Sequence, residues 1–203
     1  MVATVALFFL LSPQVEHQKH HPPRNPEEYA KILENPQRDA WQKPHEVIQA
    51  LKLRADEVVA DIGAGSGYFT RRFARHVKQV FAVDIDAKLL SILDKQGAPN
   101  IKNILAAPDN PRLADGSVDT VFICDVLHHI DNRPAYYTKL SKALKPGGRI
   151  VIVDFYKKPL PVGPPPAMKL SEEEVTAELK AAGSKVAERH TFLPHQYFLV
   201  FQK

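Results

Sequence analysis

The chain has 203 residues, of which 44% are hydrophobic and 25% are charged. These values are typical of a globular protein with enough length for one sizeable core. The formal net charge of +4 is spread along the chain without a block of Lys and Arg, so we expect no nucleic-acid partner. The single cysteine, Cys124, excludes an intramolecular disulfide and a cysteine-based zinc site.

Residues 2–11 form an apolar run that is too short to span a bilayer. The run has the length of the apolar part of a signal peptide, but no Lys or Arg precedes it and no clear A-x-A cleavage site follows. Three interpretations stay open: the remnant of an export signal, a hydrophobic tail on a membrane surface, and a helix packed on the domain. Next come His17, His20 and His21, which lie close enough in the sequence to bind a metal. A solvated linker explains them better than a metal site does.

Two helices are expected before the main fold. Proline and acidic residues begin the first over residues 26–33, and Asn35-Pro36 ends it. The second covers residues 45–51 and has an apolar stripe. Trp41 lies between them, and we expect it to fasten this region to the core; covering a ligand is the alternative.

From residue 58 onward, apolar strand patterns alternate with helix patterns. The expected strands are 58–62, 79–84, 101–106, 120–124 and 149–154, and the expected helices are 68–76, 87–95 and 134–144. Such alternation predicts an α/β fold with a doubly wound, mostly parallel sheet.

The C-terminal part begins with a proline-rich, extended loop over residues 157–166. Ser171 and Glu174 have the spacing of a capping box, which predicts a helix that ends near residues 182–183. Two closing strands follow over about residues 185–192 and 197–201. The strands predict a final hairpin.

The most informative pattern is Asp61-x-Gly63-x-Gly65-x-Gly67, between an apolar strand and a helix start. Glycines at such a turn let bare backbone approach a nucleotide-like ligand. A dinucleotide fold would have its third glycine where this chain has Tyr68. The alternative is a plain tight turn without a ligand.

This glycine pattern resembles motif I of the class I S-adenosylmethionine (AdoMet)-dependent methyltransferases. The resemblance extends over about residues 47–202. It implies a seven-stranded Rossmann-like sheet whose last strand is antiparallel, with AdoMet as the cofactor. AdoMet carries no pyrophosphate, so the loop has to pass under a cationic amino-acid tail and an adenosine.

Asp84 ends the second strand, 17 residues after Gly67. The resemblance places it on the ribose of the cofactor, because one carboxylate offers two oxygens to two hydroxyls. Capping the helix that opens at Ala87 is the alternative role, which Asp86 can fill instead.

Residues 113–119 look like the "LPFPDGSFD" stretch of the same family. This alignment puts Ala107 where many relatives have an acid that binds adenine. The nearest side chain able to accept the adenine amino group is Asp109; an ordinary loop acid is the alternative.

Residues 124–131 read CDVLHHID and resemble the "LHHI" signature of small-molecule methyltransferases. The resemblance implies that Asp125 meets the ammonium of the methionine moiety or orients the acceptor. One of His128 and His129 would face the acceptor and take its proton, since a neutral imidazole is a suitable base near pH 7. The alternative is that one histidine caps the next turn and the other packs.

The candidate catalytic residues are therefore Asp125, His128 and His129, and no metal is expected. The candidate cofactor-binding residues are Asp61, Gly63, Ala64, Gly65, Gly67, Tyr68, Asp84, Ile85, Asp109, Cys124 and Asp125.

The resemblance implies an enzyme that transfers a methyl group from AdoMet to an O, N or S atom of a small molecule. A protein methyltransferase, a non-catalytic AdoMet-binding module and, more remotely, a nicotinamide oxidoreductase are the alternatives. Residues 26–203 are expected to form a single domain, with residues 26–52 as a helical cap, 53–203 as the cofactor-binding core and 1–25 as a tail. We expect a cytoplasmic protein because AdoMet is made in the cytosol; export or membrane association through the apolar tail is the alternative.

Overall fold

The computed structural model of the protein describes residues 25–203. The expectations for the apolar run and for His17, His20 and His21 lie outside the described residues. Within residues 25–203, no helix is long and apolar enough to cross a membrane.

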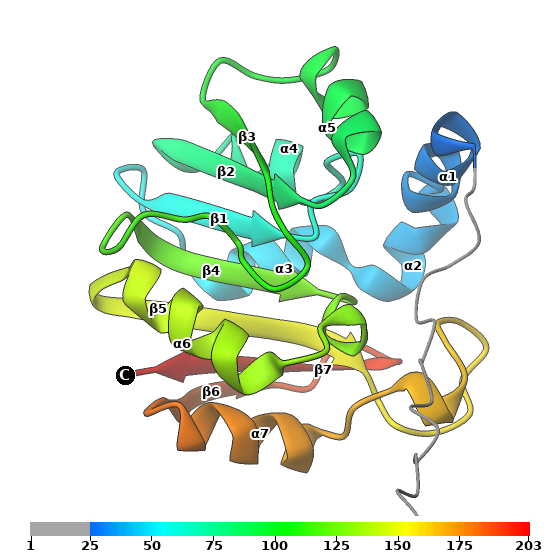
Figure 1. Ribbon diagram of the computed structural model, residues 1–203. Coiled ribbons are helices and arrows are strands. Elements are labelled where there is room, and N and C mark those ends of the chain that lie inside the picture. Colours follow the sequence, from blue (N-terminus) through cyan, green and yellow to red (C-terminus); the bar gives the residue numbers. More distant parts are fainter. Residues whose placement is uncertain (1–24) are drawn as a thin grey trace, which may run out of the picture.

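Seven strands form one sheet in the order β3-β2-β1-β4-β5-β7-β6 (Figure 1). The strands are β1 (Val58–Ile62), β2 (Gln79–Asp84), β3 (Ile101–Leu105), β4 (Val118–Cys124), β5 (Leu144–Phe155), β6 (Lys185–His190) and β7 (Gln196–Gln202). The pairs from β3 to β5 are parallel, whereas β7 runs antiparallel to both β5 and β6. The expected mostly parallel sheet with an antiparallel last strand is confirmed.

The helices lie before, between and after these strands. They are α1 (Pro26–Leu33), α2 (Asp39–Gln42), α3 (Pro44–Leu51), α4 (Thr70–Phe73), α5 (Ala87–Asp94), α6 (Arg133–Ala143) and α7 (Glu172–Ala181). Short 3-10 turns occur at Pro36–Arg38, Leu127–His129 and Pro166–Met168. Capping agrees with the sequence: Ser171 and Glu174 form the capping box of α7, and the Asp86 side chain caps α5.

Two details differ from expectation. The helix predicted over residues 68–76 is only α4, because after Phe73 the hydrogen bonds shorten to three-residue spacing: the amides of Arg75 and His76 donate to the carbonyls of Arg72 and Phe73. This tight ending turns the chain toward β2. The short helix α2 was not predicted, because four residues between two prolines carry too weak a periodic signal.

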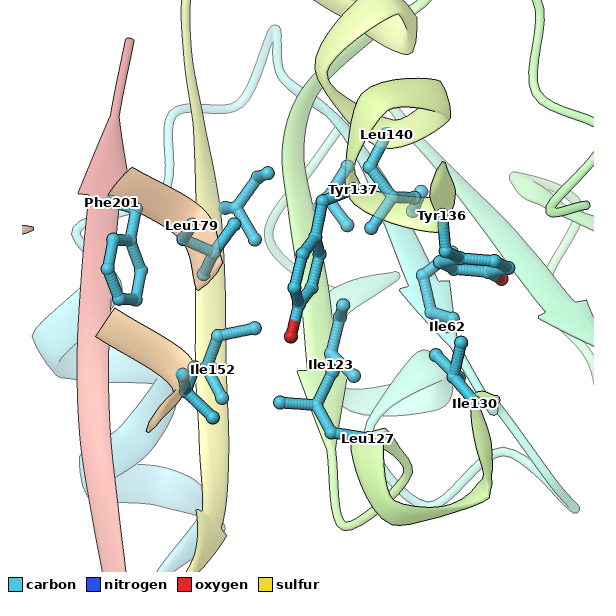
Figure 2. Packing of buried hydrophobic residues seen from close by; sticks show 14 of the residues in the cluster. Ile62, Ile123, Leu127, Ile130, Tyr136, Tyr137, Leu140, Ile152, Leu179 and Phe201 are labelled. Atoms are coloured by element: carbon cyan, nitrogen blue, oxygen red, sulfur yellow. The ribbon is translucent and has the colours of Figure 1, made fainter. Parts of the chain in front are cut away.

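Alternate residues of the central strands face two separate cores. In β4, Phe122 faces helices α3 and α4, whereas Ile123 faces α6 and α7. Figure 2 shows the second core, with Tyr136, Tyr137 and Leu140 of α6 packed against the sheet. Because both faces of the central strands are covered, these strands are largely apolar, as Val121-Phe122-Ile123 of β4 and Ile150-Val151-Ile152-Val153 of β5 show.

A substitution of Phe122 tests the packing on the face of the sheet that α4 covers. Its ring is fully buried and lies 4.8 Å from the Phe69 ring and 4.9 Å from the Phe73 ring, measured between centroids. Phe122→Ala should lower the free energy of unfolding by about 3–5 kcal/mol in urea denaturation. Leu105→Ala, at a 46% exposed position, is the control and should cost less than about 1 kcal/mol. Equal losses in the two variants would contradict this packing.

Candidate active site

Three acidic side chains converge at one edge of the sheet. Asp61 lies near the end of β1, Asp84 ends β2, and Asp125 directly follows β4. These strands are parallel neighbours with Ile62 in register with both Val83 and Ile123, so their carboxyl ends meet. The sheet order reverses between β1 and β4, and at such a switch point α/β proteins bind their ligands.

The glycine loop connects β1 to α4 at this edge. The amides of Gly63 and Ala64 both donate to the carbonyl of Val83, at 2.8 and 3.1 Å, which turns the loop back over β2. Gly63 has a φ of +73°, and a Cβ there would lie 2.2 Å from a methyl carbon of Val126. Both the backbone angle and the space at this position therefore require glycine.

Asp84 links the glycine loop to β2. One carboxylate oxygen accepts the amide of Gly65 at 2.8 Å, and the other accepts the amide of Asp86 at 2.9 Å. Burial raises the pKa of Asp84, while these amide bonds oppose the rise. Each oxygen keeps a lone pair for a further donor, so this half-buried carboxylate can still receive two hydroxyls. The next residue, Ile85, is 53% exposed and offers an apolar surface beside it.

Asp61 is buried, with 3% of its surface exposed. It accepts the Thr70 hydroxyl at 2.6 Å, which ties the end of β1 to the start of α4. Burial raises the pKa of Asp61 to about 7, although the Thr70 hydrogen bond and the charge of Arg38 lower it. Asp61 therefore fastens β1 to α4, and its burial favours the protonated form.

Asp125 has a positive φ of +60°, a strained angle for a non-glycine residue. The turn brings its carboxylate to the Gln196 amide at 2.6 Å and to the Arg38 guanidinium at 3.5 Å. Burial raises the pKa of Asp125, and Arg38 opposes that rise. The neighbouring Cys124 thiol is buried, and its pKa is raised well above the usual value by burial and by Asp125. This thiol is thus kept protonated and unreactive.

His128 and His129 lie on the 3-10 turn Leu127–His129, which begins directly after Val126. Their ring centroids are 4.0 Å apart; His128 is buried and His129 is half-buried. Both follow the end of β4 and Asp125 in the chain, and their catalytic role stays a prediction.

Two of the candidate residues have other contacts. Tyr68 is buried, and its hydroxyl donates to Asp39 while its ring faces two arginines. Asp109 lies in the loop after β3 with 79% of its side chain exposed, and it pairs with Lys139 of α6 at 3.7 Å. A role of Asp109 with adenine stays a prediction.

Four polar side chains at this edge were not found from the sequence. They are the half-buried Arg38 and the buried Gln42, Gln196 and Asp154. Gln42 donates to Gln196 at 2.7 Å, and Gln196 donates in turn to Asp125. Arg38 lies in the turn before α2, Gln42 in α2, Asp154 in β5 and Gln196 in β7, and no sequence motif marks any of them. The one signal in the sequence is the four-residue spacing of Arg38 and Gln42, which would put both on one face of a helix.

Asp154 lies next to last in β5 and is 1% exposed. One of its carboxylate oxygens accepts the amide of Phe155 at 2.8 Å. Burial and the nearby Asp125 raise the pKa of Asp154 well above its usual range. The two acids thus avoid being charged together.

The seven-stranded sheet, the glycine turn and the acid at the end of β2 define the class: this is the fold of a class I AdoMet-dependent methyltransferase. Residues 60–152 match the family model described as "Methyltransferase domain". This part of the chain is similar to the methyltransferase domains of that family.

Similar proteins agree with this class. A demethylmenaquinone methyltransferase of Tropheryma whipplei is 33% identical over 107 residues, which are 52% of this chain and 44% of that protein. The ubiquinone/menaquinone biosynthesis C-methyltransferase UbiE of Hahella chejuensis is 30% identical over 118 residues, or 54% of this chain and 47% of that protein. The chain thus matches less than half the length of these relatives.

Among solved structures, a SAM-dependent methyltransferase from Aquifex aeolicus has a TM-score of 0.81 at 23% identity, covering 89% of this chain and 99% of that one. DhpI in complex with SAH has a TM-score of 0.70 at 21% identity, covering 86% and 89%. These two likenesses establish the shared fold.

The crevice residues fit AdoMet. Asp84 has free lone pairs for a ribose diol, and the Asp125 carboxylate lies at the same edge, where it would meet the ammonium of the methionine end. Gly65 has a φ of +55° and no Cβ, so a group can pack closely on its backbone, as the Leu33 side chain does. Among residues 25–203, no cluster of three or more His, Cys, Asp or Glu side chains is arranged to hold a metal ion.

The pKa of Asp61 predicts a pH dependence of stability. An unfolded aspartate titrates near ~4, so between about pH 4 and pH 7 the folded chain holds a proton that the unfolded chain has lost. This stabilisation is complete below pH ~4 and is lost as the pH rises toward 7. Asp61→Asn removes it, so the loss of unfolding free energy between pH 5 and pH 8 should be smaller in the variant by about 2 kcal/mol.

Urea denaturation at the two pH values measures this difference. Asp115→Asn, at an exposed position, is the matched control and should behave like the parent chain. An Asp61→Asn variant with an unaltered pH dependence would show that Asp61 is charged throughout this range.

Proposed function

We propose that this protein transfers the methyl group of AdoMet to a small-molecule acceptor, at an O, N or S atom. The observation that carries the proposal is the convergence of the glycine loop with Asp84 and Asp125 at the switch point of the sheet. When bound, AdoMet supplies an already activated methyl group. The chain therefore has to position two partners, exclude water and accept one proton.

The binding roles follow from the contacts described above. Asp84 would accept the ribose hydroxyls, with the Gly65 amide holding its carboxylate in place at 2.8 Å. Asp125 would face the ammonium of the methionine moiety, since Gln196 fixes its orientation. The backbone of Gly63 and Gly65 would lie against the nucleoside part of AdoMet.

The group that accepts the proton would come from the turn after Asp125. One of His128 and His129 would accept the proton that the acceptor loses, and we propose that the other one packs within the turn.

The acceptor site would form around the carboxyl ends of β4 and β5. Trp41 packs on Phe155 there, with ring centroids 5.6 Å apart, and the proline-rich loop after β5 lies beside Phe155 through Gly163. These elements add little volume beyond the core fold, which favours a small acceptor over a macromolecule. The printed names of the relatives concern quinone biosynthesis and, for UbiE, C-methylation, so a quinol carbon joins O, N and S as an acceptor atom to be tested. A cytoplasmic address forms part of the proposal.

Loss of the Asp84 carboxylate tests the cofactor role. Asp84→Ala should weaken AdoMet binding by about 1–3 kcal/mol, because the ribose hydroxyls and the Gly65 amide lose their acceptor. Isothermal titration calorimetry measures the change. Asp86→Ala is the matched control: it removes the cap of α5 and should cost stability while leaving AdoMet affinity within about twofold. An unchanged affinity in Asp84→Ala would remove Asp84 from the site.

An activity assay tests the proposed methyl transfer. With AdoMet and a panel of phenols, quinols, amines and thiols, at least one acceptor should give S-adenosylhomocysteine and a methylated product by mass spectrometry. With that acceptor, His128→Gln or His129→Gln, but not both, should lower kcat by about 10²-fold or more. Tight AdoMet binding without turnover on any acceptor would favour a binding module over an enzyme.

A further inference from the structure

Residues 33–42, which we call the cover segment, lie directly on the glycine loop. A Cβ built on Gly65 would be 2.9 Å from the Leu33 side chain, so Leu33 rests on the bare backbone of the loop. The Ser66 hydroxyl donates to Glu34 at 2.8 Å, and Arg71 pairs with the same carboxylate. The cover segment is thus fastened to the loop at Gly65 and Ser66 and to helix α4 at Arg71.

Arg38 reaches further into the crevice than any of these contacts. Its guanidinium lies 4.1 Å from the Tyr68 ring centroid and 3.5 Å from the carboxylate of Asp125, and only 15% of its side chain is exposed. Its terminal nitrogen also approaches the Cys124 sulfur at 4.0 Å. Arg38 therefore lies beside the end of β4, at the switch point.

Contacts within the cover segment hold this arginine in place. It donates to the Leu33 carbonyl at 3.2 Å and twice to Gln42, at 3.1 and 3.2 Å. Gln42 is fully buried and donates to Gln196, which donates to Asp125. Arg38 and its acidic partner are thus joined by one continuous polar network.

The methionine end of AdoMet carries an ammonium, a sulfonium and one carboxylate, so its net charge has the same sign as that of Arg38. Asp125 can pair closely with one cation at a time in a half-buried crevice, because two cations packed together there repel each other. Leu33 likewise covers the loop backbone against which the nucleoside would lie. The same contacts cannot be made by the cover segment and by the cofactor.

We propose that the cover segment is an internal competitor of AdoMet, with Arg38 in the place of the cofactor's cationic end and Leu33 on the glycine loop. This inference rests on the proposed function. AdoMet binds after the segment leaves, so the measured affinity is the intrinsic affinity multiplied by the fraction of open molecules. A substitution that weakens the contacts of the cover segment therefore raises the fraction of open molecules and tightens AdoMet binding.

Arg38→Gln and Leu33→Ala test this with calorimetric titrations of AdoMet and of S-adenosylhomocysteine. Each variant should bind both ligands about tenfold more tightly than the parent chain, because the same segment has to leave for either one. Arg54→Gln is the matched control: this arginine is 61% exposed, pairs with Asp56, and should leave both affinities within about twofold. Leu33→Ala keeps every charge and carries the test if Arg38→Gln does not fold.

Weaker or unchanged binding in the variants, with normal binding by the parent chain, would overturn the competitor role and identify Arg38 as a ligand contact or a bystander. Absence of AdoMet binding in the parent chain and in all variants would instead overturn the cofactor assignment on which the inference rests.

Discussion

The parallel pairing of β1, β2 and β4 is the constraint on which the rest of the structure depends. In register, these strands bring Asp61, Asp84 and Asp125 to one edge. The central strands are largely apolar on both faces, and these three acids lie at or just beyond their carboxyl ends. A crevice with several carboxylates follows from this topology, and it suits a ligand that carries positive charge.

Two features of the chain offset the negative charge of these carboxylates. Burial raises the pKa values of Asp61, Asp125 and Asp154, which favours their protonated forms. Arg38 supplies a cation next to Asp125. Together these effects reduce the repulsion among the carboxyl groups at this edge of the sheet.

Much of the fold was predictable from the sequence because local signals and topology agree. The apolar runs at residues 58–62 and 120–124, together with the Ser171–Glu174 capping box, fixed strands and a helix that the structure contains. The short helix α2 and the short extent of α4 were not predictable. Both depend on tertiary contacts and on single hydrogen bonds, and neither leaves a periodic pattern of its own.

The candidate site was predictable where motifs mark it and not elsewhere. The glycine spacing and the acid at residue 84 lead to residues that the structure brings together through the Gly65 amide. Arg38 and Gln196 are 158 residues apart in number yet belong to one network through Gln42 and Asp125. Only the folded chain joins them, because pairing across such a separation has no signature in one sequence.

The most direct test of the central claim is a crystal structure of the protein with S-adenosylhomocysteine. The ligand is expected at the switch point between β1 and β4, with its ribose on Asp84, its amino-acid end beside Asp125 and Arg38 displaced. A well-ordered crystal in which this crevice holds no ligand at saturating concentration, or in which the ligand lies at another edge of the sheet, would contradict it.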